Sequence, residues 1–134
     1  MGSEVPLRVM VVDDDKPACA ATTGMLESLG YRADCETDSL SALKVFSENP
    51  GEFDLAIIEP MLSNLMGLDL AVRFRHIRPG FPVLIYAGYA DESIIGRIEA
   101  EGLGLVAFKP FKTNELAAAI RDRLSGSEQR PVLH

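Results

Sequence analysis

The chain has 134 residues, which is typical of one domain, and its 47% hydrophobic and 25% charged residues exclude a largely disordered chain. A formal net charge of −7 argues against nucleic acid as a direct partner, because phosphate binding needs clustered Lys and Arg. No apolar run is long enough to cross a bilayer, and the start does not resemble a signal peptide, so we expect a cytoplasmic protein without a membrane partner.

Along the chain, short apolar runs alternate with segments whose apolar residues recur every three to four positions. The predicted strands are 7–12, 31–36, 53–58, 82–87 and 104–108. The predicted helices are 17–30, a helix capped by Asp38 or Ser39, 67–77, a helix capped by Asp91 and a last helix opened by Thr113.

These five strand–helix units predict the fold class. Strands this apolar are typical of a parallel sheet that helices cover on both faces. Right-handed crossovers then favour an α/β, flavodoxin-like (βα)5 doubly wound sheet with strand order 2-1-3-4-5. We expect an N-terminal extension over 1–6, one domain over 7–125, and a tail or linker stub over 126–134.

The two cysteines and the histidines show no metal-type spacing. Cys19 lies in a helical pattern and Cys35 in a strand pattern, and we predict two small thiols in a reducing compartment. His76 lies between charged and apolar residues of a predicted helix, which favours a solvated side chain.

Charged residues gather where the predicted strands end. The first strand runs into Asp13 and Asp14, the third ends at Glu59, and the fifth ends at Lys109. The carboxyl ends of parallel strands share one edge of the sheet, so we expect these groups to meet in one crevice. Mg2+ relieves the repulsion among such carboxylates and a lysine neutralises a phosphoryl oxygen, which predicts a phosphoryl-transfer type of site.

Residues 7–124 resemble the receiver domains of bacterial two-component response regulators and hybrid histidine kinases. The segments that carry the resemblance are VMVVDDD, FDLAII with a glycine eight residues after Glu59, PVLIYAGYAD and FKPF. The resemblance implies that the domain at 7–125 is a receiver domain. It also implies that Asp13, Asp14 and the backbone carbonyl of Met61 bind Mg2+, and that Lys109 contacts phosphate.

Five positions depart from the pattern of that family, one of them Met66, which stands at a common acidic or small residue. Glu59 stands at the phosphoacceptor aspartate, Ala87 at a hydroxyl residue that grips the phosphoryl group, Val106 at a switching aromatic residue, and Ser63 at a common proline. The extra methylene of Glu59 misplaces its carboxylate, and a misplacement of about one ångström costs on the order of a hundredfold in rate. We therefore predict a degenerate site without catalytic activity, in which the aspartyl-phosphate switch is disabled.

The role of Glu59 leaves alternatives open. A salt bridge to Lys109 is the preferred interpretation, and partial imitation of a phosphorylated aspartate is the other. Glu59 is also a candidate third metal ligand, or it occupies the place of the metal, so Mg2+ binding stays open.

The favoured function is a pseudo-receiver that acts by binding a histidine kinase or another signalling protein. The resemblance implies a docking face that comprises the helix near 91–101, strand 104–108 and the last helix, and the same face is a possible route to a homodimer. One alternative is a receiver that accepts phosphate on Glu59. The other is a haloacid-dehalogenase-like phosphatase, which Asp13-x-Asp15 matches in spacing but Lys16-Pro17 does not support.

Overall fold

The computed structural model describes residues 5–87, 92–108 and 111–125. The strands are β1 (Arg8–Val12), β2 (Arg32–Glu36), β3 (Leu55–Ile58), β4 (Val83–Ala87) and β5 (Gly104–Phe108). The helices are α1 (Lys16–Ser28), α2 (Ser39–Glu48), α3 (Gly67–Ile77), α4 (Glu92–Ala100) and α5 (Thr113–Leu124), with a short 3-10 turn, η1 (Pro50–Glu52), before β3.

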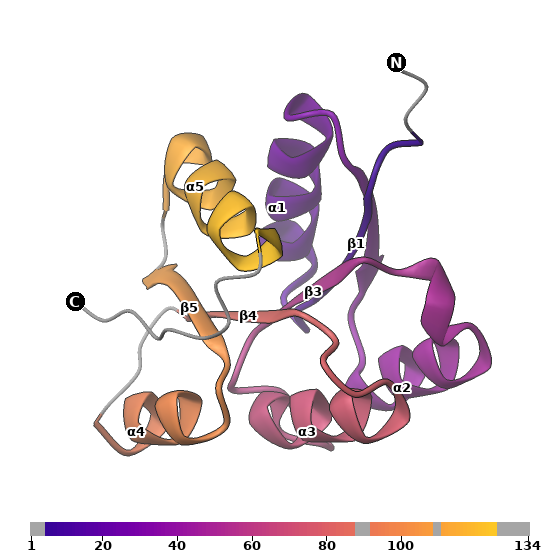
Figure 1. Cartoon of the computed structure of the whole chain (residues 1–134), viewed down its shortest axis with the longest axis vertical. Coiled ribbons are helices and arrows are strands. Elements are labelled where there is room, and N and C mark those ends of the chain that lie inside the picture. Colours follow the sequence, from indigo (N-terminus) through magenta and orange to yellow (C-terminus); the bar gives the residue numbers. More distant parts are fainter. Residues whose placement is uncertain (1–4, 88–91, 109–110, 126–134) are drawn as a thin grey trace.

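The strands form one parallel sheet in the order β2-β1-β3-β4-β5. Helices α1 and α5 cover one face, and α2, α3 and α4 cover the other (Figure 1). The predicted fold class and strand order are confirmed. The winding of the chain reverses between β1 and β3, so the carboxyl ends of these two central strands are where a ligand site is expected.

Two hydrophobic clusters hold the layers together, one on each face of the sheet. The larger one contains Phe46, whose ring centroid lies 4.3 Å from that of Phe74 and 4.7 Å from that of Phe81. The cluster on the α1 and α5 face is built around Val9, Val11 and other side chains of the central strands. All four residues of β3 are buried, as expected for a strand that is covered on both faces.

Helix boundaries follow from local capping. Asp15 caps α1 by accepting from the Ala18 amide at 3.4 Å, and Asp38 caps α2 by accepting from the Ser41 amide at 2.9 Å. Thr113 is the first residue of α5, but the N-cap is Lys112, whose amide donates to Glu115 at 2.7 Å. The predicted first helix thus begins one residue earlier than the pattern suggested, because Asp15 supplies the cap.

The prediction of two separate thiols is wrong. Cys19 of α1 and Cys35 of β2 form a disulfide, with their Cα atoms 6.0 Å apart. Helical and strand periodicity placed each residue in the correct element, but the crossover from β1 through α1 to β2 is what brings the two sulfur atoms together.

Two other expectations concern the ends of the chain and the membrane. Residues 1–4 and 126–134 lie outside the described residues, so the extension and the tail stay predictions. Within the described part of the chain, none of the helices combines the length and the apolar character that a membrane span requires.

Candidate functional site

Two buried carboxylates lie side by side at the ends of the central strands. Val12 and Ile58 are register partners in β1 and β3, and the Glu59 amide donates to the Val12 carbonyl at 3.0 Å. Asp13 and Glu59 follow these residues directly, and only 1% and 8% of their surfaces are exposed. The prediction that Glu59 faces the acids after β1 is thus supported by the pairing of β1 with β3.

Asp13 is held by donors of the protein itself. Its Oδ2 accepts from the Tyr86 hydroxyl at 2.8 Å, and its Oδ1 accepts from the Asp15 amide at 3.0 Å. Burial, followed by the charge of Asp13, raises the pKa of Tyr86 far above its usual value. The hydroxyl therefore stays protonated and can donate a hydrogen bond to Asp13. Sequence reasoning missed Tyr86, although a tyrosine in an apolar strand usually needs a partner for its hydroxyl.

The Tyr86→Phe variant is expected to lower the free energy of unfolding by about 1–3 kcal/mol, because Asp13 loses a donor in a buried environment. The aromatic ring keeps its edge-to-face contact with Phe111, whose centroid lies 5.6 Å away, so packing is preserved. Urea unfolding of both proteins measures the difference. The Tyr31→Phe variant, which removes a hydroxyl outside this site, is the matched control, and equal losses in the two variants would contradict the assigned role of the Tyr86 hydroxyl.

Asp14 reaches across to the loop between β3 and α3. Its Oδ2 accepts from both the amide and the hydroxyl of Ser63, each at 3.3 Å. A proline at position 63 would have neither donor. The departure at Ser63 thus adds hydrogen bonds to an exposed carboxylate that the resemblance assigns to metal binding.

Glu59 turns back onto its own loop, where its Oε2 accepts from the Met61 amide at 3.3 Å. The same loop is tied to α2 through Ser39, whose hydroxyl donates to the Ser63 carbonyl and accepts from the Leu65 amide, both at 3.0 Å. Asn64, in the left-handed region at φ 63°, donates to Asp38 at 2.8 Å. These contacts position the loop that carries Glu59.

Two carboxylates, one at the end of β2 and one just after it, have pKa values shifted in opposite directions. The Ser41 amide, which donates to Asp38, is the largest influence that lowers the pKa of that carboxyl. Burial, with added repulsion from Asp34 and Asp38, raises the pKa of Glu36. Near the site, a backbone donor thus favours the charged form of Asp38, and burial disfavours the charged form of Glu36.

Among the described residues, no group of three or more His, Cys, Asp or Glu side chains is placed so that it could hold a metal ion. Carboxylate oxygens suit Mg2+ chemically. Asp13, Asp14 and Glu59 each accept a hydrogen bond from the protein, and the binding of Mg2+ stays a prediction. The metal-ligand role of Met61, whose side chain is 54% exposed, stays a prediction.

Of three other predicted positions, Ala87 and Val106 are assigned to a strand, and Lys109 is not among the described residues. The pairing of Lys109 with Glu59 therefore stays a prediction. Ala87 is the last residue of β4, and Val106 lies within β5. The missing hydroxyl and the missing aromatic ring at these positions follow from residue identity.

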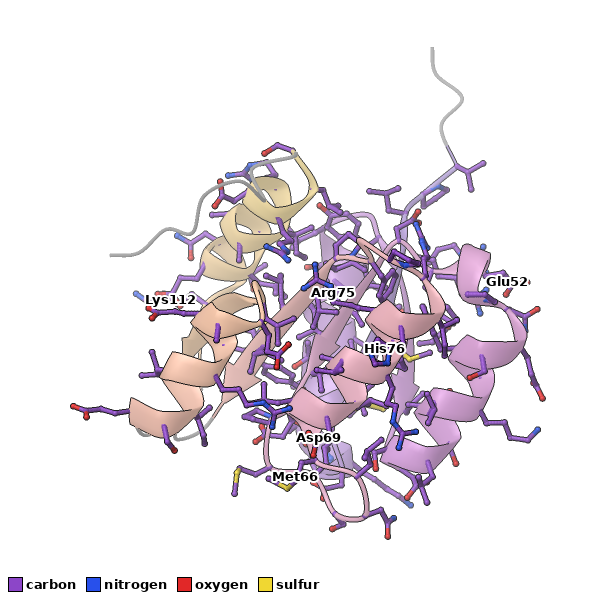
Figure 2. All side chains as sticks on the ribbon, turned by 60° about the horizontal axis from the view of Figure 1, so that its bottom comes forward. Glu52, Met66, Asp69, Arg75, His76 and Lys112 are labelled. Carbon is purple, nitrogen blue, oxygen red and sulfur yellow. A yellow bond between two sulfur atoms is a disulfide. The ribbon has the colours of Figure 1, made fainter. Side chains whose placement is uncertain are left out.

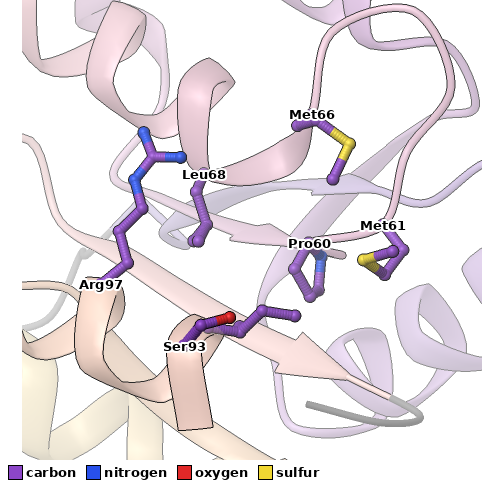
Figure 3. A pocket seen from close by; sticks show the side chains of 7 residues that line it. Pro60, Met61, Met66, Leu68, Ser93 and Arg97 are labelled. Atoms are coloured by element: carbon purple, nitrogen blue, oxygen red, sulfur yellow. The ribbon is translucent and has the colours of Figure 1, made fainter. Parts of the chain in front are cut away.

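A small apolar pocket of about 280 Å³ opens beside Glu59, between the loop after β3 and α4 (Figure 3). Its lining comprises Pro60, Met61, Met66, Leu68, Ser93, Ile94 and Arg97. The side chains of Met61 and Met66 are 54% and 41% exposed. The lining contains no carboxylate, so the pocket suits an apolar side chain better than a cation.

Polar side chains flank this pocket on α3 and α4. Arg97 of α4 donates to Asp69 of α3 at 2.7 Å, which joins the two helices. Figure 2 shows Met66 and Asp69 at the beginning of α3 and His76 farther along the same helix. His76 is exposed, which confirms the prediction of a solvated side chain.

Comparison with known proteins gives consistent matches. A family model described as the response regulator receiver domain matches residues 9–121. The DNA-binding response regulator MtrA of Mycolicibacterium smegmatis is 30% identical over 126 residues, which cover 93% of this chain and 54% of that protein. The chain spans about half of the length, or less, of the curated relatives that it matches.

Solved structures agree in fold. A receiver domain protein from Clostridium thermocellum superposes with a TM-score of 0.84 at 24% identity, covering 92% of this chain and 98% of that one. A CheY-like receiver domain protein from Methanospirillum hungatei has a TM-score of 0.82 at 26% identity, covering 93% and 98% of the two chains.

Proposed function

Because this chain belongs to the response regulator receiver domain family, we propose that it is a signalling module whose output does not depend on aspartyl phosphorylation and which acts through contacts with other proteins. Receiver domains of this family take part in two-component signalling.

The observation that supports this proposal most directly is that each of the three carboxylates of the site accepts a hydrogen bond from within the protein. Asp13 accepts from Tyr86, Asp14 from Ser63, and Glu59 from the Met61 amide. Phosphoryl transfer relies on acids that hold a cation and on an acceptor oxygen with a free approach. Each of the three carboxylates accepts at least one hydrogen bond from within the fold, which supports a site that is stable without phosphate.

The length of Glu59 supports the same proposal. Its carboxylate is 8% exposed and folds back toward the Met61 amide, whereas in-line attack needs an oxygen that points at the incoming phosphorus atom. Ala87, at the end of the neighbouring strand, has no hydroxyl to grip a phosphoryl oxygen.

We expect the wild-type chain to gain no stable phosphoryl group when it is incubated with acetyl phosphate and Mg2+, or with a histidine kinase that carries radiolabelled phosphate. Intact mass and gel autoradiography are the measurements. Label that appears on the wild type and disappears in the Glu59→Gln variant would establish phosphate acceptance on Glu59 and overturn the proposal.

The proposed partner is a histidine kinase or another signalling protein in the cytoplasm. The proposed docking face is α4, β5 and α5, and the same face is the proposed route to a homodimer. The apolar pocket supports this choice, because Ser93, Ile94 and Arg97 of α4 line it. Loss of partner binding in the Ile94→Asp variant, with unchanged binding in a Leu40→Asp control on the exposed side of α2, would support this face.

A further inference from the structure

The disulfide between Cys19 and Cys35 joins two elements on either side of the acidic loop. Cys19 lies on α1, the helix that follows the loop, and Cys35 lies on β2, the strand that pairs with β1 before the loop. They are the two cysteines of the sequence, so the chain offers no competing intramolecular pairing.

The two cysteines differ in solvent exposure. Cys19 is fully buried in the cluster beneath α1. Cys35 is exposed, because β2 is an edge strand and pairs on one side with β1. An external thiolate can therefore approach Cys35, while Cys19 is shielded by the helix.

Both ends of the disulfide connect to the backbone of the acidic loop. The Cys19 amide donates to the carbonyl of Asp15, the N-cap of α1, at 2.9 Å. Next to Cys35, the Glu36 carbonyl accepts from the Asp13 amide at 3.1 Å. The disulfide closes a covalent ring over residues 19–35. The 13–15 loop lies outside this ring, and the two hydrogen bonds link it to the two ends of the bridged segment.

We propose that Cys19 and Cys35 form a reversible thiol–disulfide exchange site, attacked at Cys35 by a partner dithiol, and that its redox state changes how firmly the 13–15 loop is held. Disulfides in reducing compartments are usually transient or redox-sensing. Cys35 is exposed to an attacking thiolate, and the buried Cys19 is the leaving group. This arrangement is more typical of a disulfide that exchanges with thiols than of a purely structural disulfide.

The exchange balances without any further reactant. A thiolate of the dithiol attacks the Cys35 sulfur, a mixed disulfide forms, and Cys19 leaves as a thiolate that takes up a proton. The second thiol of the partner, as thiolate, then attacks its own sulfur in the mixed disulfide, and Cys35 leaves and is protonated. The chain gains two electrons and two protons, and the dithiol becomes a disulfide; a disulfide oxidant such as oxidised glutathione reverses the steps.

The test compares the native chain before and after dithiothreitol. We expect thiol alkylation followed by mass spectrometry to detect no free thiol before treatment and two after it, with a melting temperature lower by about 5–10 °C in the reduced form. A chain that already carries two free thiols when purified under oxidising conditions, or a bond that dithiothreitol does not open in the folded protein, would overturn the proposal.

The coupling to the acidic loop needs its own measurement. Amide hydrogen exchange at Asp13 and Asp15 should become several-fold faster on reduction, while the amides of α3, on the opposite face of the sheet, serve as the internal reference (Figure 1). The Cys19→Ala/Cys35→Ser double variant is the control and should show no response to dithiothreitol. Unchanged exchange at both aspartates on reduction would refute the coupling. These readouts are independent of phosphorylation, so they stand or fall separately from the proposed function.

Discussion

Replacing Glu59 with aspartate is expected to restore binding of beryllofluoride, a phosphoryl mimic, in the presence of Mg2+. Aspartate is shorter by one methylene, so its carboxylate cannot fold back to the Met61 amide in the same way, and it meets an incoming group at the distance that in-line attack requires. A misplacement of about one ångström costs on the order of a hundredfold in the rate of in-line attack, so we expect clearly tighter binding of this phosphoryl mimic by the variant than by the wild type.

Titration with Mg2+ followed by beryllofluoride measures this gain. The intrinsic fluorescence of tyrosine provides one signal, and the amide spectra of residues near 13–15 provide another. The Glu59→Gln variant is the control, because it keeps the length of the side chain and removes the charge. Equal responses of the wild type and the Glu59→Asp variant would show that the length of the acceptor does not limit the site.

Adding Ala87→Thr to Glu59→Asp is expected to strengthen the response further. A threonine hydroxyl at the end of β4 supplies the donor that Ala87 lacks. A double variant that responds no better than Glu59→Asp alone would assign the whole defect to the acceptor position.

The Gly67→Ala variant is expected to destabilise the protein by about 3 kcal/mol and to displace the loop that carries Glu59. A Cβ atom at Gly67 would lie 2.8 Å from the Pro60 Cα and 2.9 Å from the Glu59 carbonyl carbon, and it would overlap the Glu59 carbonyl oxygen. These neighbours are backbone atoms and cannot rotate away. The Gly67 amide, which donates to the Pro60 carbonyl at 3.0 Å, would shift with them.

Urea unfolding measures the loss, and the amide signals of 59–66 report the displaced loop. Gly24→Ala is the matched control, since Gly24 is exposed within α1 and an added Cβ there would meet no atom within 4 Å. That variant is expected to gain about 0.5–1 kcal/mol, because alanine is the better helix former. A Gly67→Ala protein as stable as the Gly24→Ala protein would contradict the close approach.

The internal hydrogen bonds explain how an acidic crevice persists without phosphate. Each of the carboxylates has a donor within the chain: Tyr86 of β4 for Asp13, and Ser63 and Met61 of the loop after β3 for Asp14 and Glu59. Buried carboxylates without partners would destabilise the fold. The departures at Glu59 and Ser63 are therefore accompanied by hydrogen bonds within the loop after β3 and from that loop to Asp14.

The sequence by itself determined the elements and their order. Alternation of strand and helix periods predicted the parallel sheet, and residue identity alone established that Glu59 replaces the acceptor and that Ala87 lacks a hydroxyl. These features are local: a hydrophobic period describes a few neighbouring residues, and a strand end is visible wherever an apolar run meets a charge.

The contacts between distant residues were decided only by the tertiary structure. Tyr86 and Asp13 are separated by 73 positions, and Ser63 and Asp14 by 49. The disulfide between Cys19 and Cys35 depends on how α1 packs against the edge strand β2. Periodicity reports which face a side chain occupies but not which residue of another element lies opposite, because strand register and helix packing are set by the whole core.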